Sequence, residues 1–134
     1  MFIERIEIRE LLMRLLHPFE TSFGSTKERH IILVKATDGS HSGWGEVTAA
    51  EGPFYSYETW KTAWHVLRDY IVPSVIGKEF RNPSEFGSLV GGIRGHNMAK
   101  AGVETALWDL ESRMSGVPLW KMLGGQREQI DCGV

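Results

Sequence analysis

The chain has 134 residues, 42% of them hydrophobic and 24% charged, which is the size and composition of one ordinary globular domain. Its formal net charge of -2 provides no general cationic field, so nucleic acid and membrane surfaces are not expected partners. Charged residues interrupt the apolar N-terminal stretch, and the single cysteine excludes an internal disulfide. We therefore expect a cytoplasmic protein.

The first third of the chain predicts three β-strands. Residues 2–14 begin with the two-residue alternation of a strand, and the β-rich run 30–37 is followed by an Asp-Gly pair at 38–39 that is typical of a hairpin turn. A third strand is predicted over 41–49. These strands would form a small antiparallel meander, with a long polar and aromatic loop over 15–29 between the first two.

The remaining two thirds predict helices. Apolar residues spaced four, three and four apart over 60–71 predict an amphipathic helix with Pro73 at its end. Residues 82–85 have the composition of a helix start, and the longest helix is predicted from about 97 to 115, with one more short turn at 118–123. Strands followed by helices indicate an α+β domain: a three-stranded antiparallel meander and then a helical bundle.

The familiar catalytic motifs do not occur in the sequence. It contains no glycine-rich dinucleotide or phosphate loop, and its five histidines show no spacing typical of a metal site. Glu46 and Glu51 lie near a loop and could share acid-base work, although carboxylates at such places more often accept hydrogen bonds from loop N–H groups. The residues alone therefore predict no catalytic group and no metal ligand.

Aromatic and hydroxyl side chains gather in two loops that follow strands of the predicted sheet. The side chains concerned are Phe19, Thr21, Ser22, Phe23, Phe54, Tyr55 and Tyr57. They could close an apolar pocket with a few hydroxyls that orient a ligand. The aromatic rings could equally fill the domain's own core, and the residues by themselves leave both interpretations open.

Several stretches, in this order, resemble the N-terminal capping domain of the enolase superfamily. They are PFETSFG, GWGEV, EGPFYS, the run from GHNMAKA to PLWKMLGG, and the terminal DCGV. Together they are most similar to the o-succinylbenzoate synthase / N-acylamino acid racemase family of the muconate-lactonizing subgroup. The resemblance implies a capping domain over residues 1–126, followed at 127–134 by the first strand of a (β/α)₇β barrel that the chain otherwise lacks.

The same resemblance implies a chemistry for the parent enzyme. Family members abstract a proton α to a carboxylate while Mg²⁺ stabilises the enediolate, and some serve menaquinone synthesis. The catalytic lysines and the metal-binding carboxylates lie in the barrel, so Mg²⁺ would be bound there and not by this chain. The expected partners are a small carboxylate substrate, the chain's own barrel, and further copies in a homo-oligomer.

Substrate binding is the part of the family's site that carries over to this chain. The first loop would fold over the substrate as a lid, and the second would line the pocket. The residues assigned to substrate binding are Phe19, Thr21, Ser22, Phe23, Ala50 and Tyr55. Alanine at position 50, where some relatives carry a larger apolar residue, leaves the width of the pocket open.

Two alternatives accompany this interpretation. The parent could be a muconate-type cycloisomerase or a dipeptide epimerase, because most of the discriminating residues would lie in the barrel. The chain could also be a free-standing α+β module that binds a ligand or partner without catalysis. Such a module would have to cover the apolar surface that a capping domain presses onto its barrel. The stretch 130–134, which reads as the start of a strand, favours the enzyme fragment.

Overall fold

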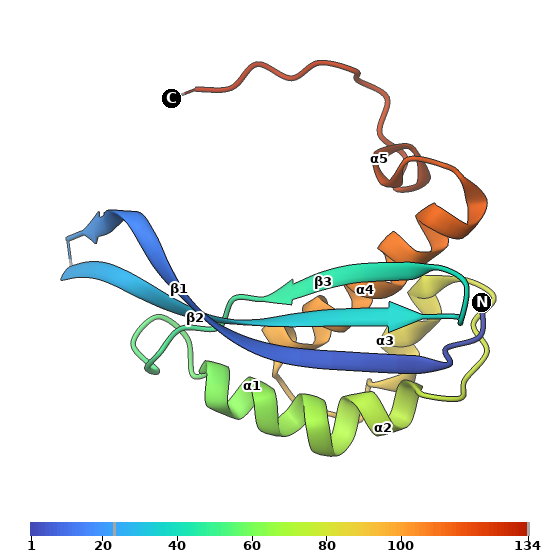
Figure 1. Cartoon of the computed structure of the whole chain (residues 1–134), viewed down its shortest axis with the longest axis horizontal. Coiled ribbons are helices and arrows are strands. Elements are labelled where there is room, and N and C mark those ends of the chain that lie inside the picture. The colour runs from blue at the N-terminus through green and yellow to red at the C-terminus, as the bar shows by residue number, and fades with distance from the viewer. Residues whose placement is uncertain (23, 134) are drawn as a thin grey trace.

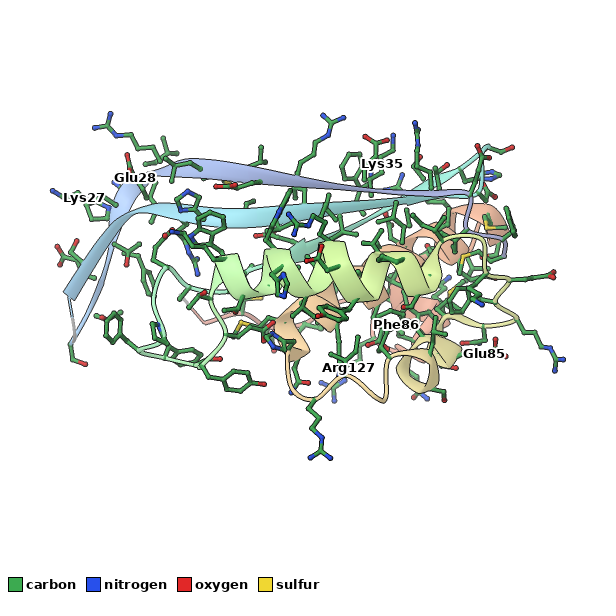
Figure 2. The ribbon with its side chains drawn as sticks, turned by 90° about the horizontal axis from the view of Figure 1, so that it is seen from below. Lys27, Glu28, Lys35, Glu85, Phe86 and Arg127 are labelled. Atoms are coloured by element: carbon green, nitrogen blue, oxygen red, sulfur yellow. The ribbon has the colours of Figure 1, made fainter. Side chains whose placement is uncertain are left out.

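The computed structural model describes residues 1–22 and 24–133, and it consists of one sheet with helices packed on a single face (Figure 1). The sheet is formed by β1 (Arg5–Thr21), β2 (Gly24–Thr37) and β3 (Ser42–Val47), antiparallel and in the order β1-β2-β3. Seen edge-on in Figure 2, the sheet lies on one side and the helices on the other. The predicted α+β meander with helices after it is thus confirmed.

The first two strands are longer than predicted. Of the residues expected to form a loop over 15–29, residues 15–21 and 24–29 instead extend β1 and β2 into a ribbon that pairs out to Thr21 and Gly24, with one irregularity between Arg14 and Phe19. The prediction was wrong because it relied on side-chain polarity, whereas strand pairing satisfies backbone N–H and C=O groups even where neither face is buried. The ribbon extends beyond the end of β3 in Figure 1.

The turn between β2 and β3 forms where the Asp-Gly pair predicts it. Gly39 has a φ of 95°, the left-handed backbone that favours glycine. Asp38 contributes through its side chain, because Oδ1 accepts hydrogen bonds from the backbone N–H groups of Ser40 (2.8 Å) and His41 (2.6 Å). This turn fixes the register in which β3 pairs with β2.

The first helical rod continues past its predicted end. It comprises α1 (Trp60–Val66), the π-helical η1 (Leu67–Ile71) and α2 (Val72–Val75). Pro73 was expected to end the helix, but it lies inside the first turn of α2. A proline ring displaces the carbonyl four residues earlier, and the wider π turn before it, in which Val72 N–H bonds to Leu67 O, provides room for that displacement.

The other helices lie close to their predicted positions. The 3₁₀ turn η2 (Pro83–Glu85) leads into α3 (Phe86–Leu89), and the longest helix, α4 (Asn97–Ser115), has the predicted bounds and is followed by α5 (Leu119–Met122). Residues 125–133 belong to no helix or strand. The predicted start of a barrel over 127–134 therefore stays a prediction, and residue 134 lies outside the described part.

The core lies between the sheet and the helices. The inward residues of β2 and β3 meet one side of α4; they are Ile32, Val34, Ala36 and Val47 against Ala99, Val103, Ala106, Leu107 and Leu110. Contact is closest at Gly45, where an added Cβ would overlap the backbone carbonyl of Gly102. Asp109 of α4 accepts a hydrogen bond from Trp44 N at 2.8 Å, which satisfies an N–H group on the edge strand β3. These contacts hold the sheet in place at the base of the ribbon.

Candidate substrate-binding cleft

An open cleft of about 910 Å³ lies between the β1–β2 ribbon and the segment 48–56. This volume is within the range of small-molecule sites. Of the six residues predicted to bind substrate, four line the cleft: Phe19, Thr21, Ala50 and Tyr55. Ser22 lies in the turn at the tip of the ribbon and is not among the lining residues, and Phe23 lies outside the described residues. Two stretches about 30 residues apart thus meet at one cleft.

The aromatic side chains of the cleft are not part of the core. Phe54 is 97% exposed, Tyr55 89% and Phe19 59%. Their apolar rings therefore face the cleft or solvent, which removes the interpretation that they fill the interior of this domain. Tyr57 has a different role, because its hydroxyl accepts a hydrogen bond from His96 N at 3.0 Å instead of lining the cleft.

The end of the second loop, residues 48–58, is held by the longest helix, α4. Glu58 is only 2% exposed, and its two carboxylate oxygens accept hydrogen bonds from Met98 N (3.0 Å) and Ala99 N (2.8 Å) in the first turn of α4. A helix leaves these N–H groups without intrahelical partners, and a carboxylate is a favourable acceptor for them. Sequence reasoning missed this contact because its partners are 40 residues apart and no local motif joins them.

The beginning of the second loop is held by His30 of β2. Glu51 accepts hydrogen bonds from the His30 backbone N (3.0 Å), from the His30 ring and from Trp60 Nε1 (2.9 Å). Partial burial opposes ionisation, but the hydrogen bonds from the His30 ring and backbone prevail, so the pKa of Glu51 lies below its ordinary value of 4.5. Glu51 lines the cleft, whereas Glu46 does not. The acid-base pair considered from the sequence is therefore not assembled at this site.

The described residues do not fit a metal site. Among residues 1–22 and 24–133, no group of three or more His, Cys, Asp or Glu side chains is placed to hold a metal ion. Carboxylate and carbonyl oxygens would be needed for Mg²⁺. Within the same residues, no helix is long and apolar enough to cross a membrane. The exposed aromatic rings of the cleft could contact an apolar group, and its lining also contains charged or titratable side chains, among them Glu28, His30 and Glu51.

A three-stranded antiparallel sheet with helices on one face is the fold of the N-terminal capping domain of enolase-superfamily enzymes. The family model described as mandelate racemase / muconate lactonizing enzyme, N-terminal domain, matches residues 5–124. The chain belongs to this family.

Its relatives are longer proteins. The o-succinylbenzoate synthase of Bacillus subtilis (strain 168) is 42% identical over 133 residues, covering 98% of this chain and 36% of the relative. An N-succinylamino acid racemase of Amycolatopsis sp is 36% identical over 134 residues, covering 100% and 36%. A solved enolase-superfamily member from Listeria innocua superposes with a TM-score of 0.88 at 30% identity, covering 95% and 34%. The chain thus spans about a third of the length of these proteins.

Proposed function

We propose that this chain is the substrate-specificity domain of a Mg²⁺-dependent enzyme that abstracts a proton α to a carboxylate. The observation that carries the proposal is the cleft, which is lined by Phe19, Thr21, Ala50 and Tyr55. The aromatic rings of Phe19 and Tyr55 are exposed there. The parent reaction is o-succinylbenzoate synthesis, N-succinylamino acid racemisation or both, which the identities of the two named relatives support.

Within this proposal, the cleft holds the part of the substrate that does not react. Phe19 and Tyr55 provide apolar walls from opposite sides, and Ala50 leaves room for the acyl or side-chain group. The Thr21 hydroxyl donates to Gly24 O at 3.2 Å, so Thr21 also shapes the tip of the ribbon. Ser22 and Phe23 complete the proposed lid. Enclosing the substrate excludes water and orients the α-carbon toward its base, which lowers the entropic part of the barrier.

The remaining machinery is assigned to a barrel that begins near residue 127. By the family resemblance, we place the Mg²⁺ ligands and the catalytic lysines in that barrel. When bound there, Mg²⁺ would stabilise the enediolate oxygens. The whole protein is proposed to be a cytoplasmic homo-oligomer. Residues 1–126 then act on substrate binding alone.

The first test is the intact mass of the native gene product, followed by assays of that product. A mass of about 40 kDa, as a capping domain plus a barrel of about 250 residues gives, is the expected result. We then expect Mg²⁺-dependent exchange of the α-proton of N-succinylamino acids, or formation of o-succinylbenzoate, both lost on addition of a chelator.

Other outcomes favour the alternatives. Turnover of muconate or epimerisation of a dipeptide, without either expected activity, would make the parent a cycloisomerase or an epimerase. A native mass near the 15.1 kDa of this chain would contradict the enzyme assignment and leave an α+β binding module. In that case, the cleft would be screened for binding of small carboxylates by calorimetry.

A further inference from the structure

His30 lies at the base of the ribbon, with a carboxylate beside each of its ring nitrogens. Nε2 is 3.3 Å from Glu10 Oε1 on β1, and Nδ1 is hydrogen-bonded to Glu51 Oε1 in the second loop. One face of the imidazole stacks on Trp60 of α1, with ring centroids 4.5 Å apart and an interplanar angle of 17°. The side chain of His30, on β2, therefore contacts β1, the second loop and α1.

The contacts around His30 form a closed set. Glu51 uses one carboxylate oxygen for His30 and the other for Trp60 Nε1, at 2.9 Å. The backbone N of Trp60 in turn donates to Ala50 O at 3.0 Å, and Lys61 Nζ lies 5.5 Å from the Trp60 ring centroid. His30, Glu51 and Trp60 each contact the other two, so displacement of one of these three side chains disturbs the contacts of the others.

These contacts argue against a catalytic role for His30, although it lines the cleft. An imidazole has two nitrogens with which to exchange protons or contact a ligand. Both nitrogens of His30 face protein carboxylates, and one face of the ring is covered by Trp60. No ring nitrogen remains for a substrate, so the function of this residue lies in what it connects.

The two walls of the cleft, the second loop and the β1–β2 ribbon, are held in place differently. The second loop is held by Glu51 at its start and by Tyr57 and Glu58 at its end. In the described part of the ribbon, most side chains beyond Glu10 on β1 and before His30 on β2 are exposed. The angle of the ribbon therefore determines the width of the cleft.

We propose that His30 is a positioning residue of the specificity cleft: by joining β1 and β2 to Glu51 and Trp60, it sets the angle of the ribbon and thus the width available to the substrate. The assignment of a substrate to this width rests on the proposed function. The positioning itself is a property of the fold, and the two are tested separately.

The positioning is tested by a distance measurement on the native full-length protein. Spin labels are attached to cysteines introduced at Lys27, near the tip of the ribbon, and at Ser88 on α3, with Cys132 and any further cysteine of the full-length protein replaced by serine (Figure 2 labels Lys27). In His30→Phe, the ring can still stack on Trp60, but both nitrogens are lost. We expect a broader distribution of distances between the labels than in the parent protein.

The matched control is His65→Phe. His65 also pairs with a carboxylate, Asp69 at 2.8 Å, and contacts an aromatic ring, Tyr70, but it does not line the cleft. This variant should keep the parent distribution. Glu51→Gln preserves the shape of the side chain but removes its negative charge, and it should also broaden the distance distribution. It provides a second variant if His30→Phe does not fold. An unchanged distribution in His30→Phe and Glu51→Gln, or equal broadening in the control, overturns the proposal.

Steady-state kinetics test the connection with specificity. In His30→Phe we expect KM for the preferred N-acyl substrate to rise on the order of tenfold, with kcat changed by less than about twofold, because the reacting groups are untouched. His30→Gln supplies an amide NH2 group that can donate to one of the two carboxylates and should recover part of the loss. A fall in kcat with unchanged KM overturns the role in specificity. If the distances broaden but none of the proposed substrates is turned over, the proposed function fails and the positioning role stands.

Discussion

Phe19 and Tyr55 line the cleft from its two segments, and their exposure shows that they contribute little to the core. Truncation to Ala should therefore leave the free energy of unfolding within about 0.5 kcal/mol. In the full-length protein, we expect kcat/KM to fall on the order of tenfold for each variant, the loss that follows when an aromatic contact to the substrate worth one to two kcal/mol is removed. Tyr70→Ala, an exposed aromatic residue on η1 outside the cleft, is the control. Unchanged kinetics in both cleft variants would contradict the lid assignment.

Glu58 is a buried carboxylate, and its removal should lower the free energy of unfolding. Glu58→Ala leaves Met98 N and Ala99 N without their acceptors, and we expect a loss of about 2 kcal/mol in the free energy of unfolding. Urea denaturation of the variant measures this loss. Glu128→Ala, at an exposed position outside the helices, should change stability by less than about 0.5 kcal/mol. Equal stability of the two variants would show that the helix start finds other acceptors.

At the scale of elements, Glu51 links β2, the second loop and α1 in a way that depends on pH. Its folded pKa lies below the ordinary value of 4.5, chiefly because hydrogen bonds from His30 outweigh the opposing effect of burial. The ionised group therefore contributes stability above pH 4.5, and this contribution is lost as the pH falls through the lower folded pKa.

Glu51→Gln should remove that pH-dependent contribution. We expect the variant to be less stable than the parent at pH 7 and the difference to shrink as the pH falls well below 4.5, as measured by urea unfolding at both pH values. Glu128→Gln is the control for loss of an exposed carboxylate. A difference that stays constant with pH would mean that the Glu51 charge takes no part in the linkage.

The contact between β3 and α4 depends on glycine. Gly45→Ala would place a Cβ against the Gly102 carbonyl, and because the Cβ is fixed by the strand backbone and the carbonyl belongs to the helix backbone, the helix must move away from the sheet. We expect a loss of about 1 to 3 kcal/mol in the free energy of unfolding. The control is Gly87→Ala on α3, where an added Cβ meets no atom within 4 Å; this variant should be neutral or slightly stabilising. Thermal denaturation of the two variants makes the comparison.

For the whole molecule, the C-terminal end exposes apolar side chains that a barrel would cover. Val117, Trp120, Leu123 and Ile130 are all exposed large hydrophobic residues. The 134-residue chain by itself should therefore bind a hydrophobic fluorescent dye, whereas the native gene product should bind much less of it. Equal dye binding by both would mean that this surface is not covered by the rest of the protein.

Local rules predicted the elements whose causes lie within a few residues. Asn82 caps the turn that follows it, accepting from Ser84 N at 2.8 Å, and Gly116 ends α4 with a φ of 67°. Gly39 similarly forms the hairpin turn where its neighbours predict one. Each depends on backbone dihedrals and on hydrogen bonds between near neighbours, so the order of strands and helices could be predicted from the residues alone.

The tertiary structure alone decided the features whose partners are far apart in the chain. The ribbon over residues 15–21 and 24–29 exists because two strands satisfy each other's backbone groups, a pairing that side-chain polarity does not report. The His30–Glu51 contact joins residues 21 apart, and the Glu58–Ala99 contact joins residues 41 apart. Such contacts depend on how the sheet and helices pack, because a carboxylate finds its N–H donors only after burial has brought their elements together.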